Sequence, residues 1–434
     1  MLRGNPGVRN LVFALGISSI GDWFNWIATV LVLQRITGGY DALGTLVIIH
    51  TGAPVVLAPL AGAAADRFDR RRLLLACDLI RIISVIGLLV AAHVGSAPLV
   101  WLFVTVQYVL SAFYTPAADA MMPSLASGDE LKTSNAMMMT FYTAAAAGGS
   151  MLGGFAVAAG GVEVAFVLDA LTFALSAFLV FNISVRPAAT ADATADAVGA
   201  RREPAIAPDR GSWADLWRQL VREPRLRASV IAVLGIGLPA GLLWVAVVAV
   251  GQGPASVGKD GALSMGILNT ATFVGSMIGT LVFNSWFVGK DDREQARGGL
   301  RLNLIRCAAL FAIAAVPLLV RVTGTYVGLG YACLVLASFS MPSGALWVVA
   351  TNFAQAHAPD PLRGRIFAML NALWAGGQAV SVFAATQAMS HGASLEAICV
   401  VMAVLVGLLS LAWVHSIAQW PRWAARDSVA TPNA

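Results

Sequence analysis

The chain has 434 residues, of which 58% are apolar and only 12% are charged. This composition excludes a water-soluble globular protein and predicts a protein that crosses a membrane several times. The formal net charge of +5 would also suit nucleic-acid binding, but the positions of the basic residues explain it by membrane topology, and we expect no nucleic-acid partner.

Apolar stretches follow one another along almost the whole chain. Each is about as long as the roughly 20 residues that a helix needs to cross a bilayer. We expect twelve membrane-spanning helices, at residues 11–33, 43–65, 73–94, 99–118, 135–158, 164–183, 228–250, 263–288, 302–320, 326–350, 366–389 and 395–417. The sequence therefore predicts an all-α protein whose surroundings are the lipid bilayer.

The basic residues predict the orientation of these helices. With the N-terminus in the cytoplasm, only Arg35, Lys259 and Arg321 of the 28 Lys and Arg residues fall on the outer side. The others, Arg81 and Arg306 among them, fall in inner segments, where positive charge is retained. We therefore expect an even number of spans with both termini in the cytoplasm.

A stretch without apolar periodicity divides the chain. Residues 186–211 are rich in Ala, Pro and charge, which is typical of a cytoplasmic linker, and we expect the linker to extend to residue 225. An amphipathic helix at about 212–222 within it carries Leu216, Trp217 and Leu220 on one face, and we expect it to lie in the inner membrane interface or to bind a partner protein. The expected domains are an N-terminal bundle (1–185), the linker, a C-terminal bundle (226–419) and a cytoplasmic tail (420–434).

Six helices, a linker and six more helices are the layout of a transporter whose two bundles rock about a central site. A shared feature supports this layout. The fourth expected helix contains Tyr114-Thr-Pro116 and the tenth contains Ser340-Met-Pro342, which lies 226 residues further along the chain. The two halves are therefore expected to be related in structure.

The densest group of charges lies between the second and third expected helices. Residues 62–72 read Gly-Ala-Ala-Ala-Asp-Arg-Phe-Asp-Arg-Arg-Arg. Gly62 and the alanines would let the second helix approach a neighbour closely. Asp66 falls where that helix leaves the membrane, and such an acid can pair with an arginine or with the N-terminal end of another helix.

This segment resembles the signature Gly-x-x-x-Asp-Arg-x-x-Arg-Arg of major facilitator superfamily transporters. The similarity extends to the drug:proton antiporter branch, which includes macrolide efflux pumps and the enterobactin exporter. The matching segments are Gly21-Asp22-Trp23, Asp78-Leu-Ile-Arg81, Tyr114-Thr-Pro116-Ala117 and Arg363-Gly-Arg365-Ile-Phe. The resemblance runs from about residue 10 to residue 415. It implies the major facilitator fold, with two pseudo-symmetric six-helix bundles, in the cytoplasmic membrane of a bacterium.

The charges around this loop are expected to form a cytoplasmic gate, which holds the bundles together in the outward-facing state and releases when the carrier opens inward. The expected members are Gly62, Asp66, Arg67, Arg70, Arg71, Asp78, Arg81 and Asp119. Asp78 and Arg81 share one helix face and are expected to pair with each other or with the loop charges. In the alternative interpretation the arginines only anchor the topology.

Asp22 lies near the middle of the first expected helix, where an ionised carboxylate is costly unless it faces water or a cation. An acid held there can take up and release a proton during a transport cycle, as a proton-coupled antiporter requires. Asp169, in the sixth expected helix, is the second proton-coupling candidate. The alternative for Asp22 is a structural acid, hydrogen-bonded to Ser18 or Ser19.

Polar and aromatic residues near the middle of the expected spans are candidates for the cargo cavity. They are Asn25, Trp26, Gln107, Tyr108, Tyr142, Asn269, Trp347, Asn371, Trp374 and Gln378. A mostly apolar cavity with a few polar groups suits a large amphiphilic molecule better than a sugar or an inorganic ion. Helix packing is the alternative role for each of these residues.

Two features differ from the drug antiporter pattern. The fourth expected helix has no arginine and offers Gln107 and Tyr108 in its place. The fifth carries Gly149-Ser150-Met-Leu-Gly153-Gly154 where that pattern has Gly-Pro-x-x-Gly-Gly. Its glycines allow close helix packing, while Ser150 removes the proline bend.

We expect a monomeric secondary active exporter that exchanges protons for an amphiphilic small molecule, such as an antibiotic or a siderophore, without a cofactor. The sequence contains no Gly-x-x-x-x-Gly-Lys-Ser/Thr loop for ATP, no identifiable catalytic constellation and no metal-ligand spacing among its four cysteines. We therefore expect neither an ATP-driven pump nor an enzyme. The alternatives are a uniporter or importer of a metabolite or lipid, and a transport-inactive membrane scaffold or sensor.

Overall fold

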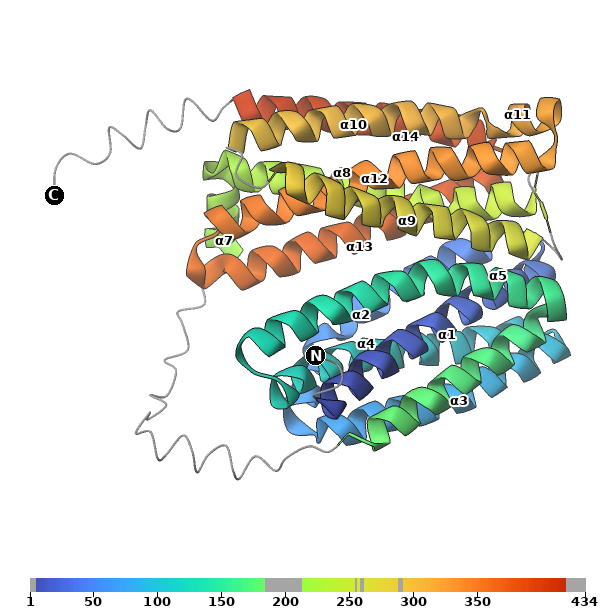
Figure 1. Ribbon diagram of the computed structural model, residues 1–434. Helices are drawn as coiled ribbons and strands as arrows, with labels where there is room; N and C mark the ends of the chain where they lie inside the picture. Colours follow the sequence, from blue (N-terminus) through green and yellow to red (C-terminus); the bar gives the residue numbers. More distant parts are fainter. Residues whose placement is uncertain (1–4, 184–212, 254–255, 258–260, 288–291, 419–434) are drawn as a thin grey trace, which may run out of the picture. The chain divides into compact units, whose positions relative to one another are not determined.

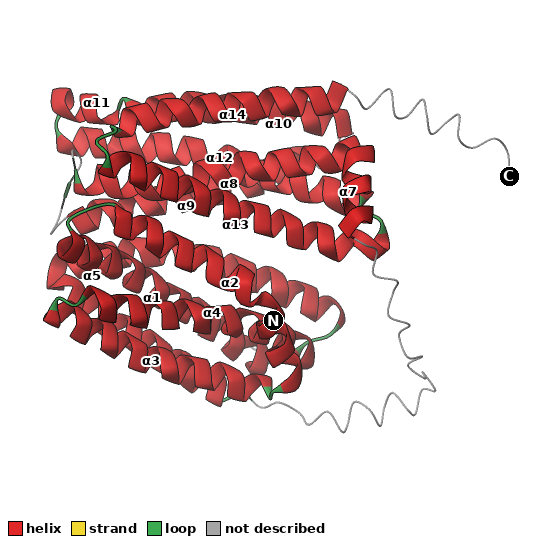
Figure 2. Ribbon diagram, turned by 180° about the vertical axis from the view of Figure 1, so that it is seen from behind, coloured by secondary structure: helices red, strands yellow, loops and turns green. Residues whose placement is uncertain are grey.

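The computed structural model describes residues 5–183, 213–253, 256–257, 261–287 and 292–418. These residues form thirteen helices and no strand (Figures 1 and 2). The expected linker up to residue 212 and the expected tail at 420–434 lie outside the described residues. The helices are α1 (Pro6–Thr37), α2 (Asp41–Arg67), α3 (Arg70–Val94), α4 (Ala97–Leu125), α5 (Gly128–Phe181), α7 (Trp213–Arg222), α8 (Pro224–Gln252), α9 (Ala262–Phe287), α10 (Asp292–Ala314), α11 (Val316–Thr323), α12 (Thr325–His357), α13 (Asp360–Ser390) and α14 (Leu395–Ala418). The all-α prediction is confirmed.

The number of spans follows from the lengths of these helices. Ten are long and apolar enough to cross a membrane, and the bent pair of α10 and α11 gives an eleventh if it is counted as one span. The 54 residues of α5 would extend about 80 Å as one straight helix, far beyond a bilayer core of roughly 30 Å. The chain instead turns back within α5 (Figure 1). If α5 counts as two spans, the structure is consistent with the expected twelve.

Gly161 makes this reversal. Its φ is 86° and its ψ is 179°, a backbone conformation that only glycine adopts without strain. We expect Gly161→Ala to destabilise the protein by about 1–3 kcal/mol, observed as a lower midpoint of thermal unfolding in detergent. Gly148→Ala is the matched control in α5, since a Cβ there meets no atom within 4 Å. An unchanged midpoint for Gly161→Ala would contradict this account of the turn.

The expected helix at 302–320 is broken. It ends as α10 at Ala314 and resumes as α11 at Val316, with an angle of 48° between the two pieces. Pro317 lies in the first turn of α11. Because proline has no N–H and clashes with the preceding turn, the helix cannot continue straight through this point.

Contacts divide the chain into two compact units. The first comprises α1, α3, α4, α5 and the part of α2 from Gly52 onward, with residues 258–266. The second comprises α7, α8, α10 to α14, most of α9 and residues 39–51. The core of the first unit contains Leu11, Leu74 and Met121 from α1, α3 and α4. Large apolar side chains such as Phe178 lie on its outside, as expected for a surface that faces lipid.

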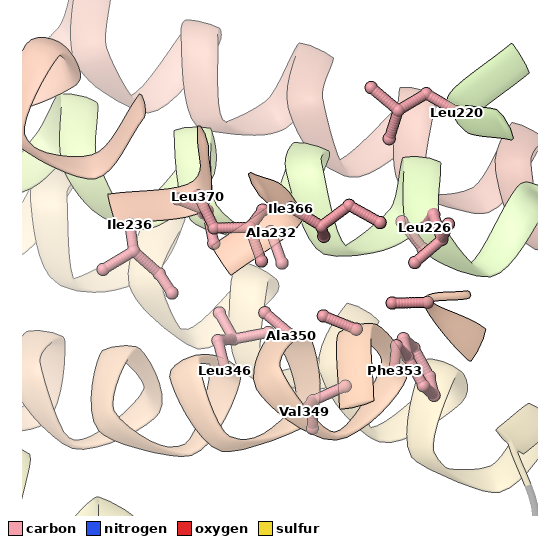
Figure 3. Packing of buried hydrophobic residues seen from close by; sticks show 14 of the residues in the cluster. Leu220, Leu226, Ala232, Ile236, Leu346, Val349, Ala350, Phe353, Ile366 and Leu370 are labelled. Atoms are coloured by element: carbon pink, nitrogen blue, oxygen red, sulfur yellow. The ribbon is translucent and has the colours of Figure 1, made fainter. Parts of the chain in front are cut away.

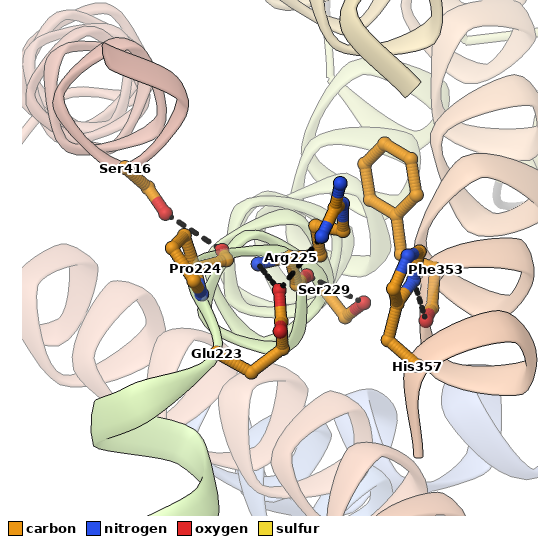
Figure 4. Close-up of polar contacts among 7 residues, drawn as sticks. All are labelled: Glu223, Pro224, Arg225, Ser229, Phe353, His357 and Ser416. Carbon is orange, nitrogen blue, oxygen red and sulfur yellow. Dashed lines mark hydrogen bonds and ion pairs between the residues drawn. The ribbon is translucent and has the colours of Figure 1, made fainter. Parts of the chain in front are cut away.

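The core of the second unit lies where α8 packs between α12 and α13. Ile236, Leu346 and Leu370 from these three helices are in its centre (Figure 3). At the beginning of α8, the Oγ of Ser416 on α14 donates to the backbone oxygen of Pro224, at 2.9 Å (Figure 4). Glu223 caps the same turn, because its carboxylate accepts from the backbone N–H of Arg225 at 3.2 Å.

Helix α7 is attached to this second unit. Leu216 and Leu220 are buried in the same core cluster, whereas Trp217 and Val221 are exposed. The predicted apolar face of α7 therefore has two parts. Leu216 and Leu220 pack against the bundle, whereas Trp217 and Val221 remain exposed. A helix of ten residues gains its stability from such packing rather than from its own hydrogen bonds.

Candidate transport site

The candidate site begins on α1, one of the two most enclosed helices. In α1 and α8, 67% of the most apolar stretch is buried, against 17% in α2. Asp22 lies midway along α1 with an exposed side chain, although Gly21 and residues 24–33 are buried. Because hydrocarbon solvates a carboxylate poorly, the exposed Asp22 marks a face of α1 suited to contact with water or cargo.

Asp169 approaches α1 directly beside Asp22. A Cβ placed on Gly21 would lie 2.5 Å from the Oδ1 of Asp169, so only a glycine permits this approach. The other oxygen, Oδ2, accepts from the Nδ2 of Asn25 at 2.8 Å. The Oδ1 of Asn25 in turn accepts from Thr29 at 2.9 Å. Asp169, a buried acid of α5, therefore packs against α1 at Gly21, the residue that precedes Asp22.

One oxygen of the Asp169 carboxyl group lacks a hydrogen-bond partner among the described residues. Its side chain is 0% exposed, and its Oδ1 has no hydrogen-bond partner in the part of the chain that the structure describes. A buried carboxylate with one free oxygen is costly unless a proton or a cation neutralises it. The pair of acids around Gly21 therefore provides two positions at which a proton could be held.

Asp78 and Arg81 lie in a second buried cluster in the first unit. The Oδ2 of Asp78 accepts from Ser176 at 2.8 Å, and the hydroxyl groups of Ser176 and Tyr114 are 3.0 Å apart. Arg81 donates from Nη2 to the hydroxyl of Ser111, and its guanidinium lies 4.9 Å from the centre of the Tyr114 ring. The cluster therefore joins α3 and α4 to the second half of α5.

Asp78 and Arg81 lie in the same cluster, but the expected direct ion pair between them is absent from the described residues. No ion pair within 4 Å joins Asp78 to Arg81 in the described chain; hydroxyl groups and an aromatic ring lie in their surroundings instead. The loop charges do not join them either, because Arg70 and Arg71 reach other helices. A spacing of three residues places two side chains on one helix face, but neighbouring helices decide which groups they contact.

Arg70 and Arg71 bind backbone oxygens at helix ends. Arg70 donates from Nη1 to the backbone oxygen of Ala120 on α4 at 2.8 Å. Arg71 donates to the backbone oxygens of Val180 and Phe181 at the end of α5 and lies over the Phe181 ring. Cations at the carbonyl ends of helices are favourable. The two arginines therefore fasten the loop to the first unit.

The other expected gate residues lie at the surface. Asp66, Arg67 and Asp119 are exposed, and a Cβ placed on Gly62 would meet no described atom within 4 Å. The close approach expected at Gly62 is therefore absent from this conformation. Asp69, which the sequence analysis did not single out, caps α3: its Oδ1 accepts from the backbone N–H of Arg72 at 2.8 Å.

The cavity candidates of the first unit differ in their surroundings. Asn25 and Trp26 are buried, Tyr108 is half-buried, and Tyr142 is exposed. Gln107 is buried, and neither of its amide atoms has a hydrogen-bond partner among the described residues. An amide left unsatisfied in this way needs water or a ligand to complete its hydrogen bonds.

The second unit contributes the other cavity candidates. Gln378 is buried and accepts from the indole Nε1 of Trp244 at 3.1 Å. The rings of Trp347 and Trp374 meet edge to face, with their centres 6.0 Å apart. Asn269 is buried, whereas Asn371 is exposed and donates to the backbone oxygen of Phe367 at 3.0 Å.

The glycines of α5 lie at close helix contacts. A Cβ on Gly149 would lie 3.0 Å from the Cα of Ile20, and one on Gly153 would lie 3.1 Å from the backbone oxygen of Trp23. α1 and α5 therefore cross with their backbones close together on either side of Asp22. A Cβ on Gly154 would lie 2.6 Å from the backbone oxygen of Ala262, which belongs to the same unit.

Several residues of these clusters were not predicted from the sequence. Ser111, Ser176 and Thr172 were overlooked because single hydroxyl residues are common within membrane spans. Thr172, whose hydroxyl donates to the backbone oxygen of Asp169 at 2.7 Å, follows Asp169 by three residues, a spacing that would have placed it on the same helix face. The contacts of Ser176 with Asp78 join residues 98 positions apart, and no local pattern indicates them.

The long apolar helices define the class of protein as a polytopic membrane protein. The family model of the Major Facilitator Superfamily matches residues 11–382. The chain belongs to that superfamily.

Curated relatives match one part of the chain. A proposed bacilysin exporter, BacE, of Bacillus subtilis (strain 168) is 28% identical over 187 residues, which are 43% of this chain and 46% of that protein. The lysophospholipid transporter LplT of Salmonella paratyphi B is 28% identical over 170 residues, 39% of this chain and 41% of that protein. The chain thus matches less than half the length of these relatives.

Solved structures share the fold over nearly the whole chain. A bacterial homologue of the iron transporter ferroportin in an inward-facing state has a TM-score of 0.64 at 14% identity, covering 94% of this chain and 98% of that one. The nucleoside transporter NupG has a TM-score of 0.67 at 12% identity, with coverage of 94% and 98%. At such identities the similarity establishes the fold alone.

Proposed function

We propose that this protein is a proton-driven exporter of an amphiphilic small molecule, belonging to the drug:proton antiporter branch of its superfamily. The observation that carries this proposal is the position of Asp22, exposed in the middle of the enclosed helix α1 and adjacent to the contact of Asp169 with Gly21. Two acids at this depth supply the proton site that antiport requires. The similarity to a proposed exporter supports the outward direction of transport.

The coupling in this proposal is a competition for one site. A proton that enters from outside neutralises Asp22 and displaces the cargo. Loss of that proton to the cytoplasm restores the carboxylate and with it the site for new cargo. Antibiotics, siderophores and related metabolites are the proposed cargo classes, because the candidate cavity residues combine aromatic rings with a few amide groups.

The charges at residues 66–72, together with Asp78, Arg81 and Asp119, are proposed to control opening on the cytoplasmic side. Arg70 and Arg71 are fastened to the first unit, so this loop moves with that unit. We place the protein in the cytoplasmic membrane of a bacterium, as a monomer with both termini in the cytoplasm, on the basis of its basic residues.

A second candidate function is the transport of a lysophospholipid without proton coupling. The similarity to the lysophospholipid transporter LplT favours it, as does the absence of an arginine from the middle of the fourth span.

Flux measurements in liposomes distinguish these functions. The purified protein is reconstituted and offered three labelled amphiphiles: a macrolide, a hydroxamate siderophore and a lysophosphatidylglycerol. Antiport predicts that one of them accumulates in vesicles with an acidic lumen and that reversing the gradient empties the vesicles. Flux that is independent of the gradient would favour uniport, and binding without flux would favour a scaffold.

A further inference from the structure

Arg306 is buried in the second unit, with no counter-charge beside it among the described residues. It lies on α10 and is 0% exposed. Its Nη1 donates to the Oδ1 of Asn303 at 3.2 Å, and its guanidinium lies 5.0 Å from the centre of the Phe339 ring on α12. Opposite, on α8, a Cβ on Gly235 would come within 3.9 Å of Nη1. Three helices therefore surround this cation.

One edge of the guanidinium is unused. Nε and Nη2 have no hydrogen-bond partner among the described residues, and no ion pair of Arg306 is found within them. The N–H bonds of these two nitrogens point in the same direction, which is the geometry that grips two oxygens of a carboxylate or a phosphate. Asn303 occupies the other side, so the free edge is held in a defined orientation.

Burying an arginine without an anion beside it lowers the stability of the folded protein. Arginine keeps its proton in proteins, so it cannot escape burial by becoming neutral. A neutral amide and an aromatic ring compensate less than the removal of an ion from water costs. Burial of an ionised group without a partner therefore indicates that an anion completes the site in another state of the protein.

The first unit contains a related cluster that carries its own anion. Asp78 and Arg81 precede Asn303 and Arg306 by 225 residues each, close to the offset between the prolines of α4 and α12. In both units the arginine lies over an aromatic ring of the helix that carries the proline. The first unit supplies Asp78, whereas the second has the uncharged Asn303 at the same position.

We propose that Arg306, oriented by Asn303, binds an oxyanion, a carboxylate or a phosphate, that belongs to the transported amphiphile. This inference rests on the proposed function in one respect: it assumes that the ligand is cargo. It narrows the cargo class from amphiphiles in general to amphiphiles with an anionic group. The side chain is fully enclosed in the present conformation, so binding requires the helices around it to separate.

A thermal-unfolding titration tests this site in the full-length protein, purified and delipidated in a neutral detergent. The probes are octyl phosphate and octyl glucoside, which share one tail and differ in charge. We expect octyl phosphate to raise the unfolding midpoint in a saturable manner and octyl glucoside to leave it unchanged. Equal responses to both probes would overturn the proposal.

Variants assign the response to Arg306. In Arg306→Met, the apparent dissociation constant for octyl phosphate should rise by at least about tenfold, as expected when a charge-assisted contact is lost. Without ligand, this variant should unfold at the same temperature as the wild type or higher, because an uncompensated buried charge has been removed. Arg301→Met, which removes an exposed arginine of the same helix, should keep the full response.

Arg306→Lys keeps the assignment testable if the methionine variant does not fold. A lysine retains the charge but loses the two-pronged edge, so octyl phosphate should bind more weakly than in the wild type. Unchanged binding in either folded variant would overturn the role of Arg306.

Two further comparisons complete the test. The first distinguishes an anionic cargo from a membrane lipid, and the second distinguishes failure of this inference from failure of the proposed antiport. If phosphatidylglycerol produces the saturable shift and octyl phosphate does not, the site binds a membrane lipid, and the cargo assignment is wrong. Because the titration needs no pH gradient, it can succeed while proton-driven flux fails. Conversely, gradient-driven flux of a neutral amphiphile, unaffected in Arg306→Met, would overturn this inference and leave the proposed antiport intact.

Discussion

Replacing Asp22 with asparagine is expected to abolish the accumulation of cargo driven by a pH gradient. Asparagine has nearly the same shape as aspartate but cannot take up and release a proton, so the variant should insert into the membrane while losing coupling. In reconstituted vesicles, gradient-driven accumulation should fall to the level of protein-free liposomes. Cargo exchange in the absence of a gradient should also fall, because asparagine resembles the protonated acid from which cargo is displaced.

Glu163→Gln is the control for this experiment. Glu163 is an exposed acid between the two halves of α5, so its loss removes one carboxylate without touching the buried clusters. Accumulation in this variant should match the wild type. If Asp22→Asn retains the dependence of flux on the pH gradient, Asp22 is not the coupling residue, and Asp169 becomes the acid to examine.

Replacing Arg81 with leucine is expected to have the largest effect on stability. The change leaves Asp78, which is 0% exposed, in a cluster without its positive charge. Asp78 and Arg81 form no direct ion pair, but a buried charged group that loses its compensation typically costs about 1–3 kcal/mol or more. The midpoint of thermal unfolding in detergent should therefore fall markedly, and expression should fall with it.

A double variant tests whether the two charges act on each other. Asp78→Asn alone should also destabilise the protein, because Arg81 then loses its nearby negative charge. In Asp78→Asn with Arg81→Leu, both charges are gone, so the loss should be smaller than the sum of the two single losses. Strictly additive losses would show that Asp78 and Arg81 are independent and that the serine contacts alone stabilise the cluster.

The number and order of the helices could be predicted from the sequence because a bilayer imposes a length and an apolar composition on every span. The bend at Ala315 was missed, although Pro317 indicates it, because the apolar stretch continues across the break. The reversal at Gly161 was expected only as a gap between two spans. Its backbone conformation is visible in the structure alone.

The buried polar groups were predicted less completely. Asp22 and Asp169 stood out because acids are rare within spans, but their approach across Gly21 depends on how α1 and α5 pack. Arg81 and Arg306 were both counted among the positive residues of inner segments, whereas the structure buries both within helical bundles. A basic residue one or two turns inside a span resembles a topological anchor in the sequence, and only its neighbours identify it as buried.

Proton-driven export requires cargo and protons to move in opposite directions through one carrier. It is tested most directly in liposomes that contain a pH-sensitive dye and start without a pH gradient, when a transported amphiphile is added outside. Inward movement of cargo should expel protons, so that the lumen becomes alkaline, and Asp22→Asn should remove this change. Inward cargo flux with no change in lumenal pH in the wild-type protein would contradict it.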